Sequence, residues 1–326
     1  MAIFQKVRYT DRNESGIDER LSDRMSGCTL CPRMCGADRE NGKTGFCGET
    51  GEIRAARAAL HMWEEPCISG TKGSGAVFFS GCGLRCCFCQ NHDIAIGSRG
   101  RAVSVERLGE IFLELKEKGA ANINLVTGAH YVPQIIEALD MARRNGLDIP
   151  VVYNSSGYEK TETLKLLEGY VDIYLPDLKY LDPELAQKFS YAPDYVQAAK
   201  AAIGEMVRQT GKCEFGEDGY IRKGTIVRHL ILPGHTGNSI KALRYLHETY
   251  GEDIYISIMN QYTPLPQCRE YPELSRRVTE AEYDAVVDYA IELGIENGFI
   301  QEGDVAEESF IPEFDGEGIV RKDVDR

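Results

Sequence analysis

Residues 76–91 read AVFFSGCGLRCCFCQN, and this stretch decides what kind of fold the chain adopts. Residues 76–80 form a short apolar run, which is typical of a parallel strand covered on both faces. Cys82, Cys86 and Cys89 follow directly, with the spacing C-x3-C-x2-C. A loop that leaves the carboxyl end of a parallel strand is where α/β proteins place their chemistry. The sequence therefore predicts a cysteine-lined site at that end of a sheet.

The rest of the chain continues with strands and helices that alternate. Strand patterns are present at 76–80, 123–127, 150–154, 172–175, 225–232 and 254–259. Helical periodicity occurs at 105–118, 132–143, 161–167, 195–209 and 239–250, followed by a helix at 280–293 and a short strand at 298–301. Six successive βα units predict an α/β fold, either an open doubly wound sheet or a partial or complete (β/α) barrel.

Composition narrows the possible partners and location. The 326 residues are 43% hydrophobic, and 37 basic against 51 acidic residues give a net charge of −14. Such a charge repels nucleic-acid backbones, so we expect no nucleic-acid partner. No apolar run approaches the roughly 20 residues that span a bilayer, and the first residues lack the apolar centre of a signal peptide. We therefore expect a cytoplasmic protein with no membrane association.

The chain has eleven cysteines, which in a reducing compartment usually serve metal ligation or redox chemistry. The three thiolates at 82, 86 and 89 can hold three irons of a cubane cluster and leave the fourth iron open to an external ligand. A zinc site or a set of inert thiols is the alternative. Cys87 also permits other ligand sets, but adjacent ligands are sterically awkward, so we expect Cys87 to pack behind the loop.

This cysteine spacing, with the aromatic Phe88 directly before Cys89, resembles the signature of the radical S-adenosylmethionine (SAM) superfamily. The resemblance implies a 4Fe-4S cluster on Cys82, Cys86 and Cys89 whose open iron is chelated by the methionine part of SAM. It implies that an electron from the cluster breaks the S–C5′ bond and yields a 5′-deoxyadenosyl radical. It also implies a partial (β/α)6 barrel, in agreement with the six βα units counted above.

Within that superfamily the chain is most similar to homologues of pyruvate formate-lyase activating enzyme that carry a cysteine-rich N-terminus. The phrases that carry the resemblance are CTLCPRMCGADRENGKTGFCG, EEPCISGTKGSGAVFFSGCGLRCCFCQN, NINLVTGAHYVPQI, VDIYLPDLKY and VRHLILPGH, between residues 28 and 235. We expect three parts: a cysteine-rich module at 1–70, the partial barrel at 71–265, and a C-terminal helix with an acidic tail at 266–326.

The resemblance also assigns site residues. Asp177 and Lys179 match the family's Asp-x-Lys, in which the acid shapes the cofactor site and the lysine faces the methionine carboxylate; a surface salt bridge is the alternative. Lys179 and Arg228 are the predicted catalytic residues, and Arg228 is expected to contact cofactor or substrate. The predicted cofactor-binding residues are Phe88, Thr127, Asn154, Asp177, Lys179 and Arg228.

The sequence departs from the family pattern at three places, and these departures limit which site roles the resemblance implies. The family's Gly-Gly-Glu phrase is replaced by Thr127, Gly128, Ala129 and His130. A backbone contact to the methionine amino group is still expected, whereas the side-chain role of the missing acid is not. Asn154 replaces an acid that holds a monovalent cation, which leaves cation binding open. Asn260 stands where the activator has a histidine, so the same glycyl-radical substrate is not implied.

A second group, Cys28, Cys31, Cys35 and Cys47, has the spacing C-x2-C-x3-C-x11-C. Four thiolates at these spacings can close a zinc site or a second iron-sulfur cluster, and either would stabilise a loop-dominated segment. A site with no open position suits a structural or electron-relay role.

The predicted function is hydrogen abstraction from a protein or peptide by a radical SAM enzyme, with flavodoxin or ferredoxin as reductant. The alternatives are a small-molecule substrate, or a non-catalytic iron-sulfur protein that transfers electrons or acts as a scaffold.

Overall fold

The structure is a computed structural model that describes residues 25–97, 99–301 and 312–321. Its centre is one sheet with the strand order β10-β9-β8-β6-β5-β4-β2-β1-β3, and β7 (Glu214–Phe215) pairs with β8 outside this path. The parallel strands are β2 (Ser74–Phe79), β4 (Ile123–Val126), β5 (Val151–Ser155), β6 (Ile173–Pro176), β8 (Ile221–Leu230), β9 (Tyr255–Met259) and β10 (Gly298–Ile300). The strands that the apolar runs predict are therefore present.

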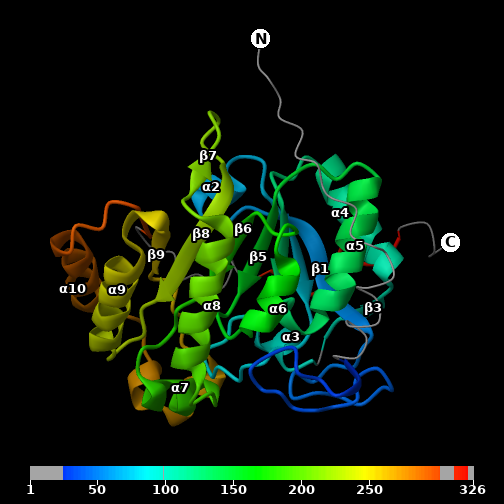
Figure 1. The fold of residues 1–326 in the computed structure, drawn as a ribbon. Helices are drawn as coiled ribbons and strands as arrows, with labels where there is room; N and C mark the ends of the chain where they lie inside the picture. The colour runs from blue at the N-terminus through cyan, green and yellow to red at the C-terminus, as the bar shows by residue number, and fades with distance from the viewer. Residues whose placement is uncertain (1–24, 98, 302–311, 322–326) are drawn as a thin grey trace.

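The major helices lie along one face of this sheet (Figure 1). They are α4 (Val105–Glu117), α5 (Val132–Arg144), α6 (Thr161–Leu164), α8 (Tyr195–Thr210) and α9 (Thr236–Tyr250), with α10 (Glu280–Glu292) beside α9. Local sequence fixes their starts: the Ser104 hydroxyl accepts the Arg107 N–H at the start of α4, and Thr279 and Glu282 form a capping box at α10. The short helices are α2 (Pro66–Ser69), α3 (His92–Ala95) and α7 (Pro183–Ser190).

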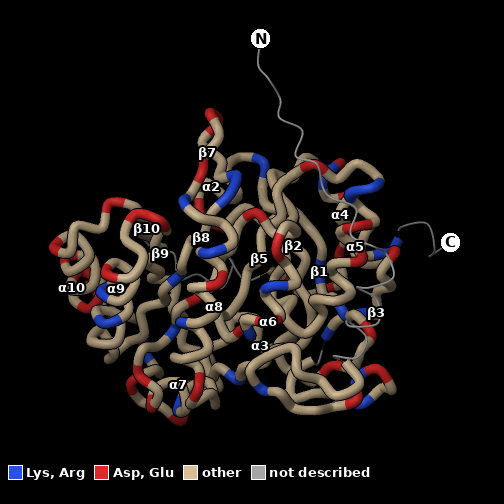
Figure 2. The backbone as a smooth tube through the Cα atoms, viewed as in Figure 1, with Lys and Arg blue, Asp and Glu red and all other residues tan. Residues whose placement is uncertain are grey.

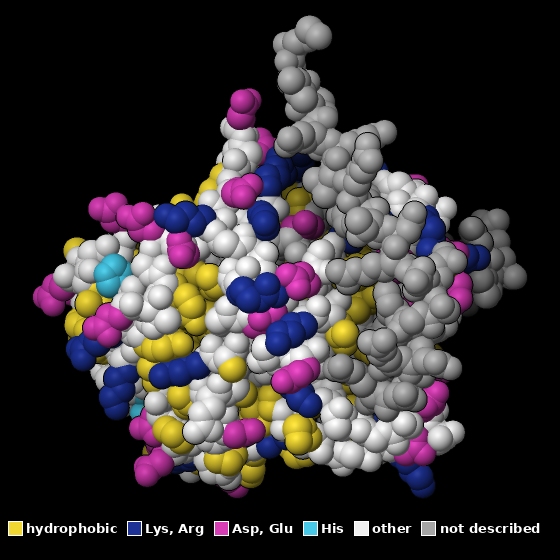
Figure 3. Space-filling view, viewed as in Figure 1, with side chains coloured by type: hydrophobic (Ala, Val, Ile, Leu, Met, Phe, Trp, Pro, Cys, Tyr) yellow, Lys and Arg dark blue, Asp and Glu magenta, His cyan; other side chains and the backbone are white. Residues whose placement is uncertain are grey.

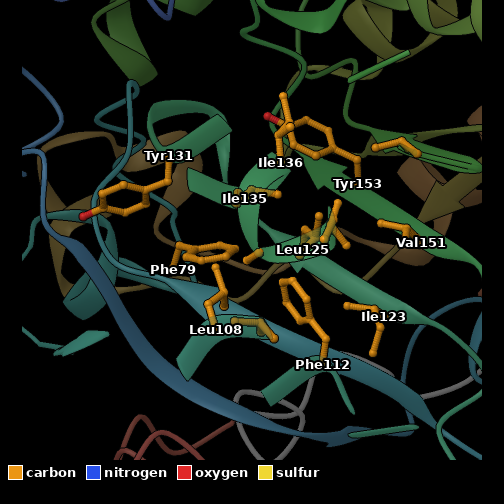
Figure 4. Packing of buried hydrophobic residues seen from close by; sticks show 14 of the residues in the cluster. Phe79, Leu108, Phe112, Ile123, Leu125, Tyr131, Ile135, Ile136, Val151 and Tyr153 are labelled. Atoms are coloured by element: carbon orange, nitrogen blue, oxygen red, sulfur yellow. The ribbon is translucent and has the colours of Figure 1, made fainter. Parts of the chain in front are cut away.

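The apolar core lies between the sheet and these helices. Figure 4 shows Phe79, Leu125 and Tyr153 from neighbouring strands facing Leu108 and Ile135 from α4 and α5. A second cluster continues this layer under α7, α8 and α9. Burial of such a continuous layer is the main source of stability for the sheet.

Two strands, β1 and β3, are present that the sequence patterns did not predict. β1 (Ile53–His61) pairs antiparallel with β2, and its first residues pair with β3 (Arg101–Val103). The expectation that the segment up to residue 70 is dominated by loops is therefore wrong for residues 53–61. The strand IRAARAALH contains four alanines and two arginines, so its burial comes from small side chains that give a weak apolar pattern.

The C-terminal segment 312–321 runs beside β1. The Ala58 N–H donates to the Glu317 carbonyl and the Gly316 N–H to the Ala56 carbonyl. The Phe314 ring packs on Phe78 with 5.6 Å between centroids. This segment therefore covers part of the edge of β1.

The surface carries charges of both signs. On the face drawn in Figure 3, Lys and Arg side chains are interspersed with Asp and Glu, whereas Figure 2 shows acidic residues gathered along α10 and at the tip of the β7 hairpin. Trp63, the one tryptophan of the sequence, is 62% exposed. Among the described residues, no helix has the length and apolarity needed to cross a membrane.

Candidate active site

The loop of residues 80–91, which we call the triad loop, leaves the carboxyl end of β2 as predicted. It contains Cys82, Cys86 and Cys89, all partly exposed and free of disulfides. The Leu84 N–H donates to Cys82 Sγ at 3.4 Å, and the Ser190 hydroxyl donates to Cys86 Sγ at 2.9 Å. Such bonds fix the direction in which a thiolate ligand points.

Backbone hydrogen bonds attach the triad loop to the end of helix α7. The Cys87 N–H donates to the Phe189 carbonyl at 2.9 Å, and the Arg85 N–H donates to the Ser190 carbonyl at 3.3 Å. α7 ends in Tyr191, a non-glycine residue with φ of 53°, and this turn presents Ser190 to Cys86. The sequence analysis missed α7 because the segment is only eight residues long, although Asp182 caps it by accepting the Glu184 N–H and Pro183 occupies the first turn, which are both signals of a helix start.

Phe88 and Cys87 anchor the back of the loop. The buried Phe88 ring lies 6.2 Å from the Tyr262 ring and 6.4 Å from the Tyr180 ring. Cys268 Sγ donates to the Cys87 carbonyl at 3.4 Å. In this arrangement Phe88 packs into the core, and its contact with a cofactor stays a prediction.

Asp177 and Lys179 lie beside the triad at the end of β6. Their side chains form an ion pair, and the Asp177 N–H donates to the Ser155 carbonyl at 2.9 Å. Burial disfavours the charge on Lys179, but the Asp177 carboxylate and the Cys86 thiol outweigh burial and raise its pKa. Lys179 is therefore a persistent cation close to Cys86, where it can also receive an anionic ligand.

A pocket lies where the triad loop meets the ends of β4 and β5. Its lining includes Cys82 and Gly83 from the triad loop, Thr127 after β4 and Ser156 after β5. Thr127 has φ of 62°, an uncommon conformation for a β-branched residue that costs of order 1–3 kcal/mol. Strain of this kind is found at functional sites, where the fold holds a backbone group in a required direction.

Comparison with known proteins identifies this arrangement. The family model described as the radical SAM superfamily matches residues 76–246, from β2 into α9. The chain belongs to this superfamily. Its 4Fe-4S cluster and SAM are therefore the cofactors of this protein, and the expected α/β fold of the radical SAM type is confirmed.

Individual relatives are more distant. The chain is 26% identical over 295 residues to the uncharacterized protein MJ0674 of Methanocaldococcus jannaschii, which covers 88% of this chain and 81% of that protein. It is 27% identical over 113 residues to the pyruvate formate-lyase-activating enzyme of Clostridium pasteurianum, which covers 33% of this chain and 46% of that enzyme.

Solved structures are also similar at low identity. SuiB of Streptococcus suis bound to precursor peptide SuiA has a TM-score of 0.46 at 13% identity, over 69% of this chain and 47% of SuiB. HydG, a maturase of the FeFe hydrogenase, has a TM-score of 0.47 at 15% identity, over 71% of this chain and 52% of HydG. The chain spans about half the length of these two structures, and likenesses at this level support no argument about activity.

The residues of this radical SAM protein fit the cluster that the family implies. Three thiols with two donors directed at their sulfurs form a suitable ligand set. Burial raises the pKa of Cys82 to about 11 and also raises the pKa of Cys86 and Cys89, so deprotonation has to come from bound iron. Among the described residues, no three Cys, His, Asp or Glu side chains surround one ion position.

Arg228, on β8, is paired with two acids. It forms ion pairs with Glu64 and with Glu65, the latter at 2.6 Å, and its contact with cofactor or substrate stays a prediction. Burial disfavours the guanidinium charge, but the two carboxylates raise the pKa of Arg228 further. Asn154 donates to the same Glu64 carboxylate at 3.3 Å. The sequence does not predict the pairing of Glu64 and Glu65 with Arg228, because a contact across 164 residues leaves no local signal.

His130 is a packing residue. It is buried, and its Nε2 lies 2.6 Å from the Ser80 carbonyl. Burial, reinforced by the charge of Arg39, lowers the pKa of His130 to about 3, so the imidazole is neutral at physiological pH. It connects the end of β4 to the start of the triad loop.

The four-cysteine loop, residues 28–50, packs directly against the triad loop. Cys28 and Cys47 are buried, Cys31 is partly exposed, and Cys35 is exposed. A Cβ placed on Gly45 would lie 3.3 Å from Cys47 Sγ and 3.4 Å from Cys35 Sγ, so the glycine leaves open the space between these two sulfurs. The binding of a metal group by these four cysteines stays a prediction.

Proposed function

We propose that this protein cleaves SAM reductively and uses the resulting 5′-deoxyadenosyl radical to abstract a hydrogen atom from a protein or peptide. The observation that carries the proposal is the three-cysteine loop at the carboxyl end of β2 with the Asp177–Lys179 pair beside it. When bound, the cluster supplies the electron and the open iron that this cleavage needs.

The surrounding residues would bind and orient SAM. Lys179 would attract the methionine carboxylate, and Asp177 would hold the lysine head in place through their ion pair. The backbone of Thr127, held at positive φ beside the pocket, would meet the methionine amino group. Arg228 would act indirectly, because its guanidinium is already paired with the carboxylates of Glu64 and Glu65. We propose that these ion pairs hold the side chains inside the barrel in position under the cofactor.

Two features favour a peptide over a small molecule. The described strands leave β10 and β3 as separate edges of the sheet, so a side of the partial barrel can admit an extended chain. The partial likeness to a pyruvate formate-lyase-activating enzyme points to the same class of substrate. Asn260 departs from the activator pattern, so the proposed substrate is a peptide segment and not a specific glycyl-radical enzyme.

Isotope transfer tests this proposal. Anaerobically reconstituted protein is incubated with SAM, a strong reductant and a set of glycine-containing peptides deuterated at every Cα, and 5′-deoxyadenosine is analysed by mass spectrometry. Deuterium in the 5′-methyl group supports abstraction from a peptide. Deuterium transfer only from a deuterated extract of small metabolites would replace the peptide substrate with a small molecule.

A further inference from the structure

The four-cysteine loop and the triad loop share a hydrogen bond and a pocket wall. The Cys82 N–H donates to the Cys47 carbonyl at 3.3 Å, so one hydrogen bond joins a candidate ligand of each group. Cys31, Cys47 and Cys82 line the same pocket. A Cβ on Gly83 would lie only 3.8 Å from Cys31 Sγ. The two cysteine groups therefore lie within direct contact of each other.

Two arginines, one from each loop, stabilise this contact. We call Arg33, Phe46 and Arg85 together the arginine clasp. Arg33 of the four-cysteine loop donates to the Gly83 carbonyl at 2.7 Å, and Arg85 of the triad loop donates to the Phe46 carbonyl. Both guanidiniums stack on the Phe46 ring, at 4.1 Å and 4.6 Å from its centroid. Reciprocal bonds and shared stacking hold the two loops at a constant separation.

The four thiols also have an inner and an outer side. Cys31 and Cys47 face the pocket beside Cys82, whereas Cys35 is exposed to solvent. Met34, next to Cys35 in the chain, is 57% exposed. A redox group held by the four thiols would therefore have one ligand, Cys35, accessible to a donor and two ligands, Cys31 and Cys47, beside Cys82 of the triad.

We propose that Cys28, Cys31, Cys35 and Cys47 bind an iron-sulfur cluster that passes electrons to the triad cluster. One electron enters from a reduced iron-sulfur or flavin protein, and one electron leaves to the triad cluster, so the N-terminal cluster returns to its oxidised state. No bond forms or breaks in this transfer. A zinc ion cannot serve, because zinc has no redox chemistry. The inference rests on the proposed function for the use of the electron.

Metal analysis and electron paramagnetic resonance test this directly on the full chain, beside Cys82→Ser/Cys86→Ser/Cys89→Ser and Cys31→Ser/Cys47→Ser. We expect about eight irons per wild-type chain and about four in each variant, because each cubane holds four. In the dithionite-reduced wild type, magnetic coupling between neighbouring clusters should broaden the signal relative to the sum of the two variant spectra.

Three other results are possible in this experiment, and each would contradict a different part of the proposal. One zinc with about four irons in the wild type would make the four-cysteine site structural, and this count needs no variant to fold. A wild-type spectrum equal to the sum of the variants would exclude a relay between neighbouring clusters. Iron that persists in the triple variant but is absent from the Cys31→Ser/Cys47→Ser protein would confirm the N-terminal cluster and contradict the proposed function.

Discussion

The triad loop and the four-cysteine loop lie against each other, but the protein builds them in different ways. Ser190 and Phe189, about a hundred residues away in the chain, bind the triad loop. The four-cysteine loop also has bonds within itself, such as Cys28 N–H to the Ala37 carbonyl and Gly36 N–H to the Cys28 carbonyl. The triad loop thus depends on the folded barrel, whereas the four-cysteine loop is shaped in part by its own local turns.

This difference matches the number of thiols that are predicted as ligands in each loop, three in the triad loop and four in the four-cysteine loop. Three thiols leave a coordination position open for a reacting molecule, and the barrel must hold them precisely because chemistry takes place there. Four thiols close a site, so a self-contained loop is sufficient to hold it.

The largest expected effect is on iron content, and it distinguishes the predicted ligand Cys86 from its neighbour Cys87. Cys86→Ala should lose the triad cluster, since two thiols cannot hold it, and Cys87→Ala should keep it. Iron content and the visible absorption of the reconstituted proteins measure this. Equal loss of iron in both variants would mean that Cys87 is a ligand and that the assigned triad is wrong.

Arg39 tests how firmly the four-cysteine loop is attached. It is fully buried and donates to the carbonyls of Thr50 and His130, each at 2.7 Å, and of Glu49 at 3.2 Å. Arg39→Met should cost about 3–5 kcal/mol, because it leaves several buried carbonyls without a donor. Denaturant unfolding of the reconstituted protein measures the loss, and a cost below about 1 kcal/mol would show that the loop is not docked as described.

The folding stability that His130 provides should decrease in acid, and both loops should be affected because His130 lies between them. Its folded pKa of about 3 lies below the ordinary value near 6.5, so the folded state excludes a proton that the unfolded state binds. Stability is therefore full above about pH 6.5 and falls as the pH drops toward 3, by about 1.4 kcal/mol per pH unit.

His130→Gln should remove that part of the slope in pH-dependent unfolding. His229, which burial likewise keeps neutral with a pKa of about 4, provides the comparison, because its ring bonds to the Leu178 carbonyl and to the Ser239 hydroxyl and to neither cysteine loop. An unchanged slope in His130→Gln would show that His130 is not buried as a neutral group.

The smallest effect concerns only the triad. Ser190→Ala removes the hydroxyl that donates to Cys86 Sγ, a bond worth about 1 kcal/mol. The reduction potential of the triad cluster should fall by about 40 mV, because a hydrogen bond to the sulfur stabilises the reduced cluster. Ser156→Ala is a suitable control because Ser156 lines the pocket without a described bond to a triad sulfur. An equal shift in both variants would point to a general change in polarity.

The sequence was informative wherever local pattern decides structure. Continuous apolar runs located the parallel strands, and the spacing of Cys82, Cys86 and Cys89 located the site at the end of β2. What it missed depends on long-range contacts or small side chains. The alanine-rich β1 gives little apolar signal, and neither the Arg228–Glu64 pair nor the arginine clasp follows from residues that lie close in the chain.

The most direct test of the central claim is SAM cleavage itself. Anaerobically reconstituted protein is incubated with SAM and dithionite, and 5′-deoxyadenosine and methionine are quantified beside Cys86→Ala. We predict equal amounts of both products from the wild type and neither from the variant. A wild-type protein that holds a full cluster at the triad but forms no 5′-deoxyadenosine would contradict the account.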